Sequence, residues 1–353
     1  MGPCPWQHSI VQVNQKSPRA RSLRVAPLLL LVLGLGAGIN PYRRPGQPLV
    51  RSGDEIVVAG QLFHTGTRVI TWMDPGGYDA YRVERRFAPL PEASWEFTRT
   101  NLPAKSSPNR YGLRQEQLNP EQAEQVRGGG WPLAILRNVV DQFVIHFDAS
   151  GTSRRCFEVL HDKRCLSVHF MIDLDGTVYQ TLDLKERAWH ATTSNGRSVG
   201  VELASPGAFP PGKEETLGAW YTKRADGKMM ITPPGGIAAA GFKVPGYTPT
   251  SARSKPIEGS IQGQALKQYD FTDAQYRSLV KLSAALCSIF PRLKCDYPKD
   301  EKGKLITRKL EDSVLKNYQG LLGHYHLQTD KVDPGPAFDW DRVIKESRRQ
   351  MRR

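Results

Sequence analysis

The spacing of apolar and polar residues predicts strands in the middle of the chain. Residues 139–147, VVDQFVIHF, form a nearly continuous apolar run with β-branched residues, which predicts a buried central strand. Residues 166–182, LSVHFMIDLDGTVYQTL, predict two strands around an Asp-Gly turn. In SVGVELA, residues 198–204, the apolar residues alternate, so that Gly200 and Glu202 share the other face. These segments predict the core of a sheet.

Helical spacing appears towards the C-terminus. Residues 271–290, FTDAQYRSLVKLSAALCSIF, place leucines on one face after a capping box of Thr272 and Gln275. Residues 319–327, QGLLGHYHL, predict another strand, and residues 339–353 predict a terminal helix with a basic end. Strands that alternate with helices indicate an α/β fold, with a mixed central β-sheet flanked by helices.

Segments rich in proline and glycine predict additions to this sheet. Residues 40–130, with a strand expected over 54–63, could be a separate small domain or an N-terminal extension that wraps the next domain; we favour the extension. Residues 205–270 form an irregular insertion with a hairpin candidate at 220–231. The main domain is therefore expected over residues 131–353.

The first 39 residues predict a targeting segment. Basic residues precede the apolar run VAPLLLLVLGLGAGI, residues 25–39, which ends in small residues. This pattern is typical of a secretory signal peptide, and an uncleaved membrane anchor is the alternative. The run is shorter than the roughly 20 residues of a comfortable membrane span. We therefore expect an exported protein of the periplasm or cell envelope.

The charge of the chain narrows the choice of partner. The formal charge is +14, and the chain stays basic if residues 1–39 are removed. A basic exported protein favours an anionic partner. Nucleic acid fits this charge but not the compartment, whereas an anionic cell-wall polymer fits both. Charged residues at 24% and hydrophobic residues at 39% are typical of a globular domain.

Four cysteines follow the targeting segment in two close pairs. In an oxidising compartment this spacing suggests the local disulfides Cys156–Cys165 and Cys287–Cys295, with other pairings left open. A zinc site made of cysteines is disfavoured, because neither pair has the spacing C-x₂₋₄-C.

Histidines and one aspartate are candidates for a metal site. His146 ends the central strand, at the edge where open sheets carry functional residues. His324 follows a glycine, and Asp333 comes later in a proline/glycine turn. Two histidines and a carboxylate are a common catalytic zinc set, with water as the fourth ligand. If the strand over residues 319–327 continues, His326 shares the face of His324, and either histidine could be the ligand.

Five motifs in this order resemble the zinc-dependent N-acetylmuramoyl-L-alanine amidases of the type-2 family, which includes the peptidoglycan-recognition proteins. They are FVIHFDAS, LSVHFMIDLDGTVYQTL, RAWHATTSN, SVGVELASPG and GHYHLQTDKVDPGPAFDW, and the resemblance covers residues 138–345. It implies the fold of that family, a zinc cofactor, and hydrolysis of the amide between the lactyl group of N-acetylmuramic acid and the L-alanine of the stem peptide.

Residue by residue, the resemblance implies that His146, His324 and Asp333 are the zinc ligands, with His326 outside the set. Phage and animal relatives usually have cysteine at the third position. An aspartate at this position resembles the branch of the family formed by bacterial anhydromuramyl-peptide amidases.

The same resemblance implies two catalytic side chains. Glu202 matches the glutamate that this branch uses as catalytic base, and Lys331 matches the lysine that stabilises the transition state. Val168 stands where phage and animal relatives have a catalytic tyrosine, which strengthens the role of Glu202.

Further residues are expected to line the implied cleft. His169, Trp189 and His190 would contact substrate or support the site, with packing as the alternative. The expected partners are peptidoglycan or muropeptides, with no nucleic acid, and the chain is expected to be a monomer. The alternative function is a non-catalytic peptidoglycan-binding module of the same fold, which loss of a zinc ligand would mark. A different zinc hydrolase such as a peptidase would need a motif like H-E-x-x-H, which the sequence lacks.

Overall fold

The computed structural model describes residues 45–101 and 107–352. The chain divides into two units between residues 49 and 50, and every element below lies in the second unit. The targeting segment expected over residues 1–39 lies outside the described residues. Within the described part of the chain, no helix is both long and apolar enough to cross a membrane.

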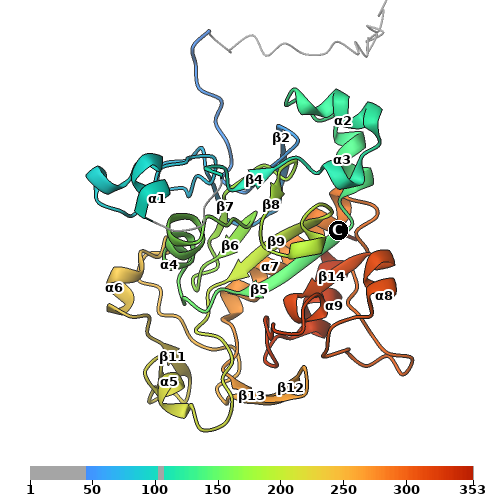
Figure 1. Ribbon diagram of the computed structural model, residues 1–353. Coiled ribbons are helices and arrows are strands. Elements are labelled where there is room, and N and C mark those ends of the chain that lie inside the picture. Colours follow the sequence, from blue (N-terminus) through green and yellow to red (C-terminus); the bar gives the residue numbers. More distant parts are fainter. Residues whose placement is uncertain (1–44, 102–106, 353) are drawn as a thin grey trace, which may run out of the picture. The chain divides into compact units, whose positions relative to one another are not determined.

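A mixed sheet, which has six strands within the described residues, forms the centre of this unit (Figure 1). Strands β14, β5, β9 and β6 run parallel, β7 pairs antiparallel with β6, and β3 pairs parallel with β7. This arrangement confirms the predicted α/β class with a mixed central sheet. In spatial order the strands are β14 (Gly320–Gly323), β5 (Gln142–Phe147), β9 (Ser198–Leu203), β6 (Phe170–Ile172), β7 (Val178–Gln180) and β3 (Val69–Thr71).

Helices cover both faces of the sheet (Figure 1). The long helix α7 (Asp273–Ile289) packs in the main core with Phe170 of β6. The next residue of β6, Met171, belongs to a second core formed with helix α4 (Ser153–Phe157). Successive side chains of a strand point to opposite faces, so these two cores lie on opposite sides of the sheet.

The helices begin where the sequence predicts. The capping box of α7 is confirmed: Thr272 N–H donates to Gln275 Oε1 and Gln275 N–H donates to Thr272 Oγ1, both at 3.0 Å. The terminal helix α9 (Trp340–Gln350) packs against α7. The remaining α-helices of the described residues are α1 (Trp95–Asn101), α2 (Pro120–Arg127), α3 (Leu133–Val139), α5 (Glu214–Gly218), α6 (Gly236–Ala240) and α8 (Asp312–Asn317), and a π-helical turn, Glu158–Lys163, extends α4.

The single strand expected over residues 54–63 is wrong. The segment folds as a hairpin of β1 (Glu55–Val58) and β2 (Gln61–His64), and the turn places both Ala59 and Gly60 at positive φ. The backbone N–H groups of these two residues donate to the carboxylate of Asp183 at 2.8 and 2.7 Å. This distant carboxylate stabilises a turn that the apolar run itself does not reveal.

The N-terminal region is built onto the sheet. Besides the edge strand β3, the short strand β4 (Tyr111–Gly112) pairs with β8 (Arg187–Ala188). Arg114 is fully buried and donates to the carbonyl groups of Leu184 (3.0 Å) and Ser198 (2.9 Å). The edge strand β3, the strand β4 and the side chain of Arg114 therefore join the N-terminal region to the main domain.

The insertion over residues 205–270 contains two hairpins. The predicted hairpin is confirmed as β10 (Tyr221–Lys223) with β11 (Met229–Ile231). A second hairpin, which the sequence did not predict, joins β12 (Ile257–Ile261) to β13 (Gln264–Gln268). The insertion thus has its own secondary structure.

Neither expected disulfide is formed, because the four cysteines within the described residues are free thiols. Cys156 packs in the apolar core beside α4, and burial raises the pKa of its thiol well above the usual value. Cys165 follows the π-helical turn at positive φ. Cys287 belongs to the main core, and the partly buried Cys295 packs against that core.

Candidate active site

The ends of three parallel strands bring the candidate residues together. His146 of β5 lies opposite Glu202 of β9 in the register of the sheet. On the other side of β5, β14 ends at Gly323, immediately before His324. The carboxyl ends of parallel strands meet at one edge, where open α/β sheets form their sites.

His324 and His326 do not share one face of a strand, which corrects that expectation. The strand ends at Gly323, and His324–His326 form a 3₁₀ turn. His326 is fully buried: its Nδ1 accepts from Gly323 N–H (2.9 Å) and its Nε2–H donates to Ile306 O (2.7 Å). With both ring nitrogens of His326 bonded to backbone, the turn leaves His324 to face the pocket.

Asp333 lies against the end of β14. Tyr325 N–H donates to Asp333 O at 3.2 Å. A Cβ atom on Gly323 would come within 2.7 Å of Pro334, so glycine at the end of the strand lets the aspartate loop approach. The proline/glycine turn therefore presents Asp333 in a fixed place beside His324.

The insertion supports the same loop. Gln268, the last residue of β13, donates to Pro334 O at 3.1 Å and accepts from Ala337 N–H at 2.9 Å. Both contacts flank the residues that follow Asp333. The insertion thus helps to position this carboxylate.

His146, His324 and Asp333 form a compact cluster of possible metal ligands. Asp333 Oδ2 lies 2.9 Å from His146 Nδ1 and 3.1 Å from His324 Nδ1, and the two nitrogens are 3.0 Å apart. Burial alone would raise the pKa of Asp333, but the two adjacent histidines, His324 first, hold it below its usual value. Burial and then His324 lower the pKa of His146 to about 4, so its imidazole is neutral at physiological pH.

The outer nitrogens of both histidines are already bonded. His324 Nε2 lies 2.7 Å from Gln328 Oε1. The amide oxygen can only accept, so Nε2 carries the proton and Nδ1 keeps its lone pair. His146 Nε2 lies 3.0 Å from His190 Nδ1. Two imidazole nitrogens and one carboxylate oxygen, with a side open to the pocket, suit a zinc ion.

Glu202 lies beside this cluster in an unusual electrostatic environment. Its exposed fraction is 9%, and its Oε2 is buried with no hydrogen-bond partner among the described residues. Burial raises the pKa of Glu202 well above its usual value, and Asp333 and Asp148 raise it further. An unpartnered buried carboxylate oxygen needs either a proton or a cation nearby.

One cavity of about 240 Å³ joins the candidate residues. Its wall includes Trp189, His190 and Lys331 as well as the possible ligands and Glu202. The structure therefore brings seven of the eight residues singled out from the sequence to one pocket: His146, Trp189, His190, Glu202, His324, Lys331 and Asp333.

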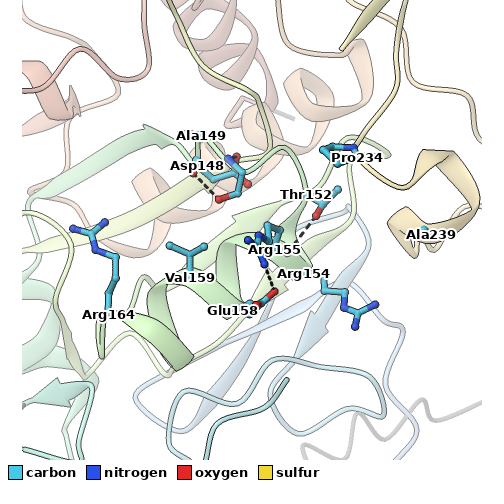
Figure 2. Close-up of a pocket in the computed structure, with 11 residues that line it drawn as sticks. Asp148, Ala149, Thr152, Arg154, Arg155, Glu158, Val159, Arg164, Pro234 and Ala239 are labelled. Atoms are coloured by element: carbon cyan, nitrogen blue, oxygen red, sulfur yellow. Dashed lines mark hydrogen bonds and ion pairs between the residues drawn. The ribbon is translucent and has the colours of Figure 1, made fainter. Parts of the chain in front are cut away.

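A larger cavity of about 720 Å³ adjoins this pocket (Figure 2). The two cavities share Asp148 and Arg164 among their lining residues. Figure 2 shows the helical segment at residues 153–164 along one wall, with Arg155 ion-paired to Glu158 at 2.7 Å. Pro234 and Ala239 of the insertion complete the lining, so the insertion contributes to the approach to the pocket.

His169 is the expected contact residue that the structure does not place on the pocket wall. It is fully buried, its Nδ1 accepts from Gly200 N–H (3.1 Å), and its Nε2–H donates to Glu186 O (2.9 Å). Burial and then Arg114 lower the pKa of His169 to about 3. It bonds to the backbone of β9 and is not among the residues that line the pocket. Val168, also fully buried, packs in the core beside α4.

Two residues of the site were missed. Gln328 lies within the motif GHYHLQTDKVDPGPAFDW but was given no role, because its position opposite His324 depends on the 3₁₀ turn that replaces the expected strand. Asp148 follows the central strand directly, which was an available signal, and its Oδ1 accepts from the N–H groups of Ser150, Gly151 and Ser205.

Comparison with known families gives one strong match. A family described as N-acetylmuramoyl-L-alanine amidase matches residues 136–336, more than half of the chain. The matched span includes the three possible ligands, Glu202 and Lys331. No curated protein matches the chain by sequence.

Solved structures provide more distant similarities. A selenomethionine derivative of AmpD is 17% identical over 67% of this chain and 89% of its own, with a TM-score of 0.30. AmiD from E. coli, solved with the substrate anhydro-N-acetylmuramic acid-L-Ala-D-gamma-Glu-L-Lys, is 16% identical over 62% of this chain and 59% of its own, with a TM-score of 0.32. The endolysin amidase LysCS from Clostridium intestinale is 15% identical over 60% of this chain and 85% of its own, with a TM-score of 0.30.

Proposed function

We propose that this chain, which belongs to the N-acetylmuramoyl-L-alanine amidase family, hydrolyses the amide between the lactyl group of N-acetylmuramic acid and the L-alanine of the stem peptide. One observation carries the proposal. Three possible metal ligands converge within 4.8 Å of one another, in the same pocket as the unpartnered carboxylate of Glu202. A non-catalytic binding module would not need this complete set.

The proposed cofactor is zinc, held by His146, His324 and Asp333. When bound, zinc would supply a Lewis acid for the scissile carbonyl and lower the pKa of a water molecule. The residues of the chain would do the rest. Glu202 is adjacent to this position and would take the proton of the attacking water and return it to the leaving amine. Lys331 lines the same pocket, and its ammonium would stabilise the negative charge that develops on the carbonyl oxygen.

The proposed substrates are muropeptides or peptidoglycan. The E. coli AmiD complex contains a muropeptide substrate, and we extend that chemical class to this chain. The 720 Å³ cavity beside the pocket provides room for groups on one side of the scissile bond. We also propose that the protein acts in the periplasm or cell envelope, because a basic chain and an N-terminal targeting pattern both fit that site.

Digestion of purified peptidoglycan tests the reaction. Incubation with the full chain should release new free amino groups of L-alanine, measured by N-terminal labelling of the soluble products. A chelator should remove this activity, and added zinc should restore it, because the donor set suits zinc. Cleavage at another bond, or none in a preparation that carries one zinc ion per chain, would refute the amidase assignment.

A basic stripe at the C-terminal end of α9 predicts salt-dependent binding to the wall. Lys345 and Arg349 lie four residues apart on α9, and Arg352 follows just after the helix ends at Gln350. All three are exposed, and none has an acidic partner among the described residues. Replacing all three by Gln should weaken retention on sacculi at low salt, measured by sedimentation. The difference from the wild-type chain should vanish at high salt, where surface charges are screened.

A matched control separates the stripe from net charge. Lys223, Lys228 and Arg99 are also exposed, and replacing them by Gln removes the same charge elsewhere. Equal losses for the two triple variants would show that total charge, and not the stripe, governs retention.

A further inference from the structure

His190 is held in place by its backbone and by the strand beneath it. Asn195 Oδ1 accepts from the N–H groups of His190 (3.0 Å) and Ala191 (2.6 Å). The ring lies over Gly200 of β9, where a Cβ atom would come within 2.4 Å of His190 Cε1. Glycine at this position of the strand therefore provides the space that the ring occupies.

The ring of His190 connects His146 to the core. Its Nδ1 lies 3.0 Å from His146 Nε2, and its Nε2 lies 3.3 Å from the buried hydroxyl of Ser198. The two imidazole rings are nearly perpendicular, at 84°. This geometry directs the lone pair of one ring nitrogen toward the edge of the other ring.

We infer that His190 is a positioning residue that fixes the tautomer and orientation of His146, so that Nδ1 of His146 presents its lone pair to the metal. The inference rests on the proposed function, in which His146 Nδ1 is a zinc ligand. A proton on His146 Nε2 is donated to His190 Nδ1, and the proton on His190 Nε2 is donated to Ser198 Oγ. The chain of hydrogen bonds then has one direction from the cluster into the core.

If these hydrogen bonds ran in the opposite direction, His146 could not bind a metal through Nδ1. If His190 Nδ1 carried the proton and donated it to His146 Nε2, the proton of His146 would lie on Nδ1 and point at Asp333 Oδ2, 2.9 Å away. Nδ1 would then have no lone pair for a metal. The tautomer of the second proposed ligand is fixed in the same way, because Gln328 Oε1 keeps the proton of His324 on Nε2. Hydrogen-bonded partners of this kind orient metal-binding histidines.

Zinc affinity of position-190 variants tests the inference. His190→Leu removes the acceptor and should weaken zinc binding by about 10–100-fold, measured by competition with a chromophoric chelator. His190→Asn places an amide oxygen near the site of Nδ1 and should recover most of that affinity. Gly200→Ala leaves His190 intact but fills its space, and should weaken binding as His190→Leu does.

A buried histidine outside the pocket supplies the control. His161 is 1% exposed and is bonded through both nitrogens, to Asp162 and to Arg82 O. His161→Leu should lower the unfolding temperature of the metal-free chain yet leave its zinc affinity unchanged. A structural role for His190 would instead lower stability without the rescue by Asn.

Nitrogen NMR of the wild-type chain gives a second readout that does not depend on any variant folding. In histidine-labelled, zinc-loaded protein, the ring of His146 should be protonated at Nε2 and metal-bound at Nδ1. A metal on Nε2, or unchanged zinc affinity in His190→Leu, would overturn the inference while leaving the amidase proposal intact. Failure of the wild-type chain to bind zinc would overturn both.

Discussion

Glu202→Gln is expected to remove most of the amidase activity while the chain keeps its zinc. The amide has the size of the carboxylate but cannot accept the proton of the attacking water. Loss of a general base typically costs about 10²–10⁴-fold in rate, and we expect kcat to fall within this range. The rate is measured from the release of L-alanine amino groups, and the metal content from the same preparation.

The position of Glu202 explains why its substitution should lower the rate without lowering the zinc content. The three possible ligands lie within 4.8 Å of one another without Glu202, which is adjacent through the register of β5 and β9. Its raised pKa suits a group that must hold a proton between attack and departure of the amine. Loss of zinc in Glu202→Gln would indicate that Glu202 is a metal ligand. A wild-type rate in this variant would indicate that Glu202 takes no part in the mechanism.

Glu258→Gln is the matched control for this experiment. Glu258 lies on β12 with a side chain that is 75% exposed and only a long contact of 3.4 Å to Lys267. The same chemical change there should leave both rate and zinc content unaltered. A loss in both variants would indicate a general effect of charge on binding to the substrate.

The central part of the fold could be predicted because burial alone specifies it. The strand over residues 142–147 is buried almost throughout, so a continuous apolar run was sufficient to identify it. Helix α7 has both a local start signal, the Thr272 capping box, and an apolar face, and the two agree. Local preference and burial point the same way in these elements.

Features that depend on distant contacts could not be predicted. The turn at Ala59 is stabilised by Asp183, more than a hundred residues away. The strand before His324 ends because His326 bonds back to Gly323 and Tyr325 bonds to Asp333. No periodicity records such contacts, and extending the strand by one residue places a side chain on the wrong face.

The candidate site also has residues that could be predicted from the sequence and residues that could not. The residues that carry chemistry could be identified from motifs, since His146 and Glu202 stand at strand ends. The residues that orient them could not, because Gln328 and the Nε2–Nδ1 contact between His146 and His190 exist only after the loops have folded. Sequence patterns report the reacting groups better than the groups that hold them.

The insertion shows how an irregular segment can act on the site without carrying a ligand. Its last strand contacts the aspartate loop through Gln268, and Gly335 approaches this side chain so closely that a Cβ atom would lie 2.2 Å from Gln268 Oε1. Its middle part lines the larger cavity through Pro234 and Ala239. One segment therefore contributes both to the position of Asp333 and to the space beside the pocket.

Asp333→Ala is expected to release zinc, whereas His326→Ala is expected to keep it. Asp333 supplies the oxygen that contacts both histidines, so its loss should weaken zinc binding by more than the roughly 10–100-fold typical of outer partners. Hydrolysis should be lost with the metal. Zinc per chain after dialysis and the rate of L-alanine release measure the two effects.

His326→Ala tests the structural role that the 3₁₀ turn gives this histidine. It leaves Gly323 N–H and Ile306 O without their partner in the core, and each such buried group costs about 1–3 kcal/mol. Chemical denaturation of the metal-free chain should therefore show a lower free energy of unfolding, with zinc affinity close to that of the wild type under native conditions. Loss of zinc in His326→Ala and retention in Asp333→Ala would reverse the assignment, because the ligand from this segment would then be His326. The two variants together thus decide whether the bend after β14 selects the ligand.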